Sequence, residues 1–214
     1  MKKEHFCILL ALAAIVVFPS YSFAHQPRLV GHETMIVVHQ PEISKAYYAE
    51  LHGLPVKYVI RSESPFKLYV NILVPDIKGI KKNVSARITS GGKVIATLGG
   101  AKAKWEHFYE EFGGDNYFRG PEFSRNVRAG VYEILVSSPD NNGKYVLATG
   151  DKEAFPLMET LNALVKMPIL KMYFEKSPFT AYFNRIGFFL SPLILLIVLL
   201  IAGAVFILRK VLKK

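Results

Sequence analysis

The chain has 214 residues, of which 51% are hydrophobic, and its mean hydropathy is +0.24. This composition excludes a largely disordered chain and indicates apolar segments in addition to a folded core. Lys and Arg outnumber Asp and Glu by 27 to 17, but half of the net charge of +10 lies in the terminal segments 1–24 and 209–214. No basic run with interleaved aromatic residues occurs, so nucleic acid is not an expected partner.

The first 24 residues have the pattern of a secretory signal peptide. A basic start precedes an uncharged apolar stretch at 6–18, and small residues lie at Ser22 and Ala24. We expect cleavage after Ala24, with an uncleaved anchor as the alternative. The only cysteine of the chain lies inside this segment. The exported domain, expected over 25–152, therefore depends on its core rather than on disulfides.

Several short segments of this domain alternate apolar and polar residues as half-buried β-strands do. They are rich in β-branched and aromatic residues and are separated by Pro and Gly; their ranges are 57–60, 67–74, 84–88 and 93–98. Gly91-Gly92 lies between the last two and predicts a two-residue hairpin turn. Strands at this spacing favour an antiparallel β-sandwich over alternating strands and helices.

Residues 101–123 interrupt the strand pattern with a group of aromatic residues. Trp105, Phe108 and Tyr109 have the spacing of one face of a helical turn, with glutamates on the other side. We expect a short helix or an irregular loop that caps one end of the sandwich. The alternative is an aromatic site for a ligand or partner, formed by Trp105, Phe108, Tyr109 and Tyr117.

The clearest strand pattern spans residues 129–150. Apolar side chains fall on one face of each of two strands, and the turn between the strands is rich in Pro, Asp, Asn and Gly. We expect these strands to cover the core as a pair, with Glu133 and Lys144 in solvent.

The same segment resembles the carboxy-terminal strands of the pre-peptidase C-terminal domain family. In those small secreted β-sandwiches the last hairpin reads roughly as Gly-x-Tyr, a strand, a Gly-containing turn and Tyr-x-Leu, which here corresponds to Gly130, Tyr132, Tyr145 and Leu147. The resemblance implies a jelly-roll-like sandwich without catalytic activity, because such domains look like accessory or binding modules. The whole chain also resembles prokaryotic exported proteins with a single membrane anchor.

The C-terminal part lacks the strand pattern. Residues 153–185 combine an apolar stripe, broken at Pro168, with aromatic residues and lysines, which is typical of an amphipathic juxtamembrane stalk. A helix packed on its own domain is the alternative. Residues 186–208 contain no charge and would span about 34 Å as a helix, which predicts one transmembrane segment. The basic tail 209–214 predicts a cytoplasmic C-terminus and a location in the cytoplasmic (inner) membrane, with the N-terminal domain outside.

No catalytic motif is present: the chain has no Gly-x-Ser-x-Gly, no His-Glu-x-x-His and no phosphate-binding Gly-rich loop. An enzyme is therefore not expected. The alternative chemistry is metal binding. After cleavage, His25 would offer its amine and imidazole to one copper ion, which resembles the histidine brace of periplasmic copper-binding proteins. His32 and His39 are the further candidate ligands, although in one unbroken strand they would point to opposite faces.

We therefore predict an all-β protein with an antiparallel, jelly-roll-like sandwich, a C-terminal helical stalk and one transmembrane helix. The expected function is that of a membrane-anchored extracytoplasmic module for binding or scaffolding. Expected partners are the lipid bilayer and another membrane or extracytoplasmic protein. No cofactor is expected unless copper binds.

Overall fold

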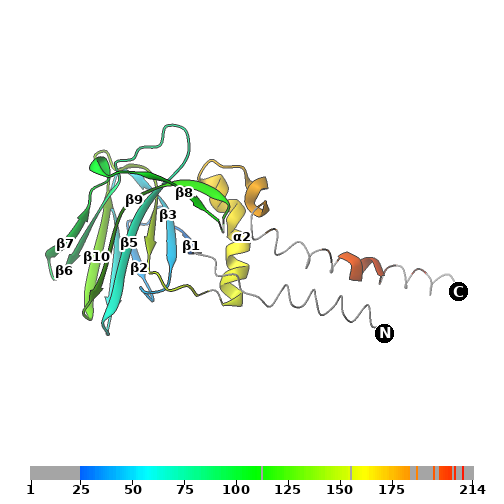
Figure 1. Cartoon of the computed structure of the whole chain (residues 1–214), viewed down its shortest axis with the longest axis horizontal. Helices are drawn as coiled ribbons and strands as arrows, with labels where there is room; N and C mark the ends of the chain where they lie inside the picture. The colour runs from blue at the N-terminus through cyan, green and yellow to red at the C-terminus, as the bar shows by residue number, and fades with distance from the viewer. Residues whose placement is uncertain are drawn as a thin grey trace.

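The computed structural model describes residues 25–111, 113–154 and 156–183, together with positions 187, 195, 198–203, 205 and 209. They form a two-layer β-sandwich with a helix against one sheet (Figure 1). The strands are β1 (Gln26–Leu29), β2 (Met35–Val38), β3 (Lys45–His52), β4 (Val56–Ser62), β5 (Phe66–Pro75), β6 (Ser85–Ser90), β7 (Lys93–Leu98), β8 (Glu106–Glu110), β9 (Asp115–Val127), β10 (Gly130–Ser137) and β11 (Asn142–Thr149). The helical elements are η1 (Gly100–Lys102), α2 (Leu157–Tyr173) and η2 (Pro178–Tyr182).

The strands divide between a six-stranded sheet, in the order β1-β3-β11-β5-β9-β8, and a five-stranded sheet, in the order β2-β4-β10-β6-β7. Consecutive strands change sheet at every step except in the hairpins β6-β7 and β8-β9. The edge pairs β1-β3 and β2-β4 are parallel. The chain reverses direction each time it crosses to the other sheet, so after two crossings β3 runs parallel to β1, and β4 runs parallel to β2. The prediction of a purely antiparallel sandwich is therefore wrong at these two edges.

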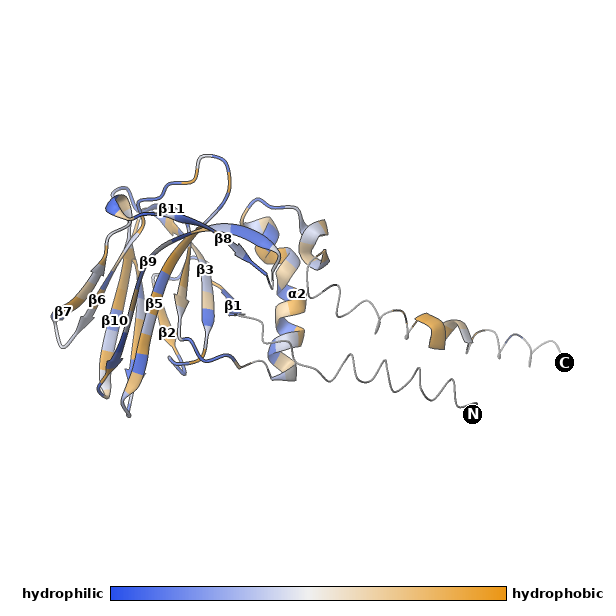
Figure 2. Ribbon diagram, in the orientation of Figure 1, coloured by the Kyte–Doolittle hydropathy of each residue, from blue (hydrophilic) through white to orange (hydrophobic). Residues whose placement is uncertain are grey.

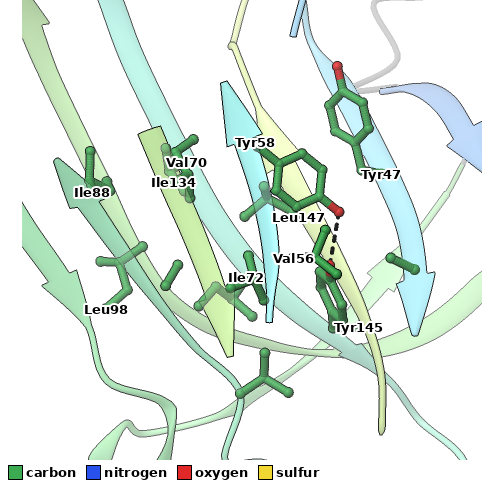
Figure 3. Close-up of a cluster of buried hydrophobic side chains, with 14 of the residues drawn as sticks. Tyr47, Val56, Tyr58, Val70, Ile72, Ile88, Leu98, Ile134, Tyr145 and Leu147 are labelled. Atoms are coloured by element: carbon green, nitrogen blue, oxygen red, sulfur yellow. Dashed lines mark hydrogen bonds between the residues drawn. The ribbon is translucent and has the colours of Figure 1, made fainter. Parts of the chain in front are cut away.

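The core lies between the sheets and contains inward-facing side chains of both (Figure 3). Aliphatic residues from both sheets are fully buried there: Ile60, Ile72, Ile88, Ile134 and Leu147. Tyr58 and Tyr145 meet within this core, and their hydroxyl oxygens are 3.0 Å apart. Because a buried hydroxyl without a partner costs free energy, this hydrogen bond allows the core to contain two phenol groups.

The strands predicted over 57–60, 67–74, 84–88 and 93–98 are confirmed as β4, β5, β6 and β7. The predicted hairpin is confirmed as well. Gly91 and Gly92 connect β6 to β7, and both have positive φ, 54° and 75°. A two-residue turn of this kind requires positive φ at both central positions, which glycine adopts without steric cost.

The two strands predicted over 129–150 are present as β10 and β11, but they do not pair with each other. β10 lies in the five-stranded sheet between β4 and β6, whereas β11 lies in the six-stranded sheet between β3 and β5. The intervening turn carries the chain across the core, so the expected hairpin is wrong. The expected core positions are confirmed, since Tyr132, Ile134 and Val136 from β10 and Leu147 from β11 are buried.

The aromatic segment after Trp105 forms the strand β8, where we expected a helix or an irregular loop. β8 pairs with β9, which places Phe108 opposite Tyr117 and His107 opposite Phe118. Over five residues the apolar spacing fits either conformation, and aromatic residues favour strands. The segment is therefore a strand rather than a helix because it pairs with the long strand β9.

The segment predicted as a stalk packs on the sandwich instead. α2 lies against the outer face of the six-stranded sheet, beside β1 and β3 (Figure 1). Leu170 of α2 and the following Phe174 pack there with Tyr48 and Val146. The physical reason is that β3 and β11 carry apolar side chains on their outer face, which need cover from water.

The predicted transmembrane helix over 186–208 is also corrected. Within the described part of the chain, no helix is long and apolar enough to cross a membrane. The expected inner-membrane location therefore loses its basis. The predicted signal peptide 1–24, the remaining positions of 186–208, and the tail apart from Arg209 lie outside the described residues.

Candidate functional site

The four aromatic residues of the predicted partner site do not share one surface. Trp105 packs on the core, and its Nε1 donates a hydrogen bond of 2.9 Å to the carbonyl oxygen of Gly100. Its ring also covers Gly120, where an added Cβ would lie 2.6 Å from the indole. Tyr117 faces the opposite side of the sheet and is 4% exposed beneath Phe174. Both residues stabilise the fold.

The other two aromatic residues lie nearer the surface. Phe108 is half-buried, and the guanidinium of Arg119 lies 3.8 Å from its ring centre. Tyr109 is exposed at 53%. Tyr109 is therefore the one member of the predicted set that presents most of its ring to solvent, and partner binding at this site stays a prediction.

The histidines proposed as copper ligands are placed with different neighbours. His25 precedes β1, and its Nδ1 lies 2.5 Å from the hydroxyl of Ser44. Burial lowers the pKa of His25 to about 4, which keeps its imidazole neutral at pH 7. The ring of His32 lies 4.8 Å from that of His52. His39 lies in the exposed turn after β2.

A metal site needs several ligands at one point. Among the described residues, no group of three His, Cys, Asp or Glu side chains could hold a metal ion. Copper binding by His25 therefore stays a prediction without a described ligand set.

A different surface is formed by α2, Phe174 and η2, which we call the helical cap. The inner side of the cap is buried against the sheet and against η2 through Met167, Leu170 and Phe174. The ring of Phe174 lies 5.4 Å from that of Tyr48 and 6.3 Å from that of Tyr117. Aromatic pairs at these separations are favourable beyond their buried area, so they fix the end of α2 on the sheet.

Charged groups also attach the C-terminal end of α2. Lys171 is 1% exposed, and its Nζ lies 2.9 Å from Oδ1 of Asp115 at the start of β9. Lys176 Nζ lies 3.6 Å from the same oxygen and donates a hydrogen bond of 2.9 Å to the carbonyl of Asn116. One carboxylate thus balances two cations under the cap. Removing it would leave buried charge unpaired, which is strongly unfavourable.

A second ion pair holds the other end of the helix. Glu159, in the first turn of α2, receives two hydrogen bonds from the guanidinium of Arg28 in β1, at 2.9 and 3.1 Å. Arg28 Nη2 also donates to Oε1 of Gln26 at 2.8 Å, and its Nη1 donates to the carbonyl oxygen of Pro27 at 3.1 Å. α2 is therefore fixed to the six-stranded sheet at both ends.

The outer side of the cap is apolar and exposed. Large apolar side chains follow one another along α2 at intervals of three and four residues: Met158, Leu161, Val165, Ile169 and Met172. The segment around η2 adds Phe179, Tyr182 and Phe183. We call these eight side chains the cap face, and Figure 2 shows apolar positions along α2. Among α2 residues whose burial is described, every exposed one is uncharged, and Asn162 is the only polar one.

The cap face was missed as a site because its stripe was assigned to a stalk. The signal was present in the sequence, since apolar residues at 158, 161, 165, 169 and 172 mark one helical face, while Leu164, Met167 and Leu170 mark a second. A helix with two apolar faces can pack on its own domain and still present a surface to another chain.

Comparison with known proteins yields likeness at the level of fold. No protein-family profile and no curated protein sequence matches the chain. Among solved structures, it is similar to the pre-peptidase C-terminal domain of a collagenase from Bacillus anthracis, with 14% identity and a TM-score of 0.36 over 56% of this chain and 97% of that chain.

Two larger enzymes also match in part. They are a β-glucosidase from Paenibacillus barengoltzii (9% identity, TM-score 0.26, 61% of this chain and 14% of that chain) and a ruminal GH26 endo-β-1,4-mannanase (10%, 0.24, 52% and 20%). Likeness at this level extends no further than a β-sandwich, which the strand pairing of the chain itself shows. The class defined so far is a β-sandwich domain with a helical cap.

Proposed function

We propose that this chain is an interaction module rather than an enzyme, and that its cap face pairs with the cap face of a second copy. The observation that carries the proposal is the uncharged apolar surface of the cap, held in place by the ion pairs of Asp115 and Arg28. Monomeric proteins rarely expose a contiguous apolar patch larger than a few hundred Å².

The size of the cap face fits a stable interface. Its eight side chains are between 45% and 84% exposed. At roughly 150–200 Å² for each large side chain, they present about 750–1,000 Å², and a standard protein interface buries about 800 Å² on each partner. Two cap faces could therefore form an interface of ordinary size.

The spacing and charge of the cap face favour a helix of the same kind as the occupant. Side chains at intervals of three and four form ridges that pack into the grooves of a second helix. The exposed residues of α2 are uncharged, and its one partly exposed lysine is Lys166, so two copies would bring few like charges together. Twofold pairing of identical surfaces is also the commonest form of oligomer.

Cysteine cross-linking tests the proposal on the full chain. Cys7 is first replaced by Ser, and Val165→Cys then places one thiol on the cap face. Val131→Cys is the matched control, since Val131 is a 41% exposed valine of β10 in the other sheet. We expect disulfide-linked dimers from Val165→Cys under mild oxidation and several-fold fewer from Val131→Cys, measured on non-reducing gels. Equal yields at the two positions would contradict the proposal.

A charge variant provides a second test. Val165→Glu would bring two carboxylates into the interface and should shift the chain from dimer to monomer in analytical ultracentrifugation. Val131→Glu should leave the dimer intact. A parent chain that sediments as a monomer would overturn pairing with a second copy. If Val165→Cys forms cross-links to a different protein and none to a second copy, the cap face has another occupant, and pairing with a second copy is overturned as well.

A further inference from the structure

A groove of about 460 Å³ lies at the edge of the sandwich where β1 and β2 end the two sheets. Its walls include Leu29, Met35, Ile36 and Val37, and Lys45 and Tyr47 of β3 contribute from within the domain. Leu29, Met35 and Val37 are 42%, 65% and 48% exposed. The groove thus has apolar walls that are open to solvent, and its volume is within the range of small-molecule sites, about 300–1,000 Å³.

Lys45 gives this groove a buried cation. The residue is 5% exposed, and its Nζ donates hydrogen bonds to the carbonyl oxygens of His39, at 2.7 Å, and Gln40, at 2.9 Å. Gln40 has a φ of 46°, a left-handed conformation that few residues other than glycine adopt. Two of the three N–H donors of the ammonium are thereby occupied by neutral acceptors.

The charge of Lys45 is not matched by an acid in direct contact. With the described acidic side chains, Lys45 forms no ion pair. Burial and, to a smaller extent, the charge of Arg28 lower the pKa of Lys45 to about 8, against the opposing effect of Glu159. A buried ammonium with one donor left gains most from an anionic ligand.

The neighbouring charged groups are few. Arg28 also lines the groove, but its guanidinium is balanced by Glu159 of α2. Glu33, between β1 and β2, His39 and Tyr47 complete the titratable groups on the lining, and burial raises the pKa of Tyr47 to about 12, so its phenol stays neutral. Since Glu33 is exposed and hydrated, Lys45 provides the site where a negative group would be held.

We propose that this groove binds a medium-chain fatty carboxylate, with the carboxylate on Lys45 Nζ and the hydrocarbon chain against the walls of β1 and β2. The carboxylate would accept the third ammonium hydrogen in a charge-assisted hydrogen bond. The apolar chain would cover Leu29, Met35 and Val37, which water otherwise contacts. This site shares no residue with the cap face, so either proposal can fail without the other.

Isothermal titration calorimetry with decanoate, below micelle formation, tests the proposal on the full chain. We expect one decanoate per chain, and binding at least about tenfold weaker for decanol, since a charge-assisted hydrogen bond contributes about 1.5–3 kcal/mol. Lys45→Met should weaken decanoate binding by a similar factor. Lys93→Met, at an exposed lysine of the β6-β7 hairpin, should leave it unchanged.

The dependence on pH separates this role from simple packing. Raising the pH from 7 to 9 removes the proton from Lys45, whose pKa is about 8, and should weaken binding of decanoate but not of decanol. Val37→Asp should also abolish decanoate binding, and because Val37 is an exposed wall residue, the new charge is not buried in the core. This variant replaces Lys45→Met in the test if Lys45→Met does not fold. The proposal would be overturned if decanoate and decanol bound equally well, or if neither substitution weakened decanoate binding. It would also be overturned if decanoate did not bind at all.

Discussion

The outer faces of the two sheets differ in what they carry. In the five-stranded sheet, β10 alternates: Tyr132 and Ile134 point into the core, while Glu133 points outward and forms a solvent-exposed ion pair of 3.4 Å with Lys57. In the six-stranded sheet, β11 does not alternate, and every residue from 145 to 149 is buried. One sheet therefore faces water on its outer side, and the other requires a cover.

This difference explains the position of α2 better than the sequence of α2 does. A strand buried on both faces reads as a continuous apolar run, as in Tyr145-Val146-Leu147-Ala148. The helix meets the apolar outer face of the sheet because that face would otherwise contact water. Lys144 shows how far the cover extends: its side chain is 14% exposed and is paired with Glu175 at 2.6 Å, although we expected it in solvent.

Removing the aromatic anchor of the cap should have the largest effect. Phe174 is 1% exposed between the cap and the sheet, so Phe174→Ala should lower the free energy of unfolding by about 4 kcal/mol through lost burial and a cavity. At a protein concentration where the chain is monomeric, Phe179→Ala, at a ring that is 83% exposed, should change it by less than about 0.5 kcal/mol. Urea unfolding of both variants makes the measurement. Similar losses would mean that the cap does not depend on its inner face.

Breaking the buried charge pair should have the next largest effect. Asp115→Asn leaves Lys171 and Lys176 without a carboxylate and should lower the free energy of unfolding by about 3 kcal/mol. Asp140→Asn removes a solvent-exposed ion pair with Lys81 and should lower the free energy of unfolding far less, because water and salt screen surface ion pairs. Chemical denaturation compares the two. An Asp115→Asn variant as stable as Asp140→Asn would show that water reaches the lysines beneath the cap.

The smallest expected effect on stability comes from valine-to-alanine substitutions on the outer faces of the two sheets. Val146 of β11 is 3% exposed beneath the cap, whereas Val131 of β10 is 41% exposed on the other sheet. Val146→Ala should lower the free energy of unfolding by about 2 kcal/mol, and Val131→Ala by less than about 0.5 kcal/mol. Thermal and urea unfolding would detect this difference. If the two substitutions cost the same, the outer faces would be equally hydrated and the comparison would be wrong.

The strands and core positions could be predicted because alternation reports which side of a strand is buried. The ranges of β4 to β7 and the inward residues Tyr132, Ile134 and Leu147 follow from it directly. The neighbours of each strand could not be predicted in this way, because alternation fixes a face and not a partner. This is why β10 and β11 were expected to pair with each other when they belong to different sheets.

The candidate sites depend on contacts between distant parts of the chain. A lysine in an amphipathic helix, such as Lys171, ordinarily faces solvent or lipid head groups, and only the folded chain brings Asp115 to it. Lys45 likewise reads as the first residue of an apolar strand, and the left-handed turn at Gln40 that supplies its carbonyl acceptor carries no glycine to mark it. Tyr117 was expected at a partner site because its sequence neighbours do not show that its ring is covered. In the folded chain Phe174, which is distant in sequence, covers it.

The alternation of strands between the sheets has a consequence for how the protein is made. β11 inserts between β3 and β5, in a register that runs from Lys45 opposite Thr149 to His52 opposite Asn142. During synthesis the two halves of the six-stranded sheet therefore cannot join until residues 142–149 have left the ribosome. The helix α2, which covers this sheet, is synthesised after them. Contacts this distant in sequence make folding slow. A nascent chain that stops before β11 leaves the β11-facing backbone N–H and C=O groups of β3 and β5 unpaired, and these are the strand edges that a chaperone would have to shield.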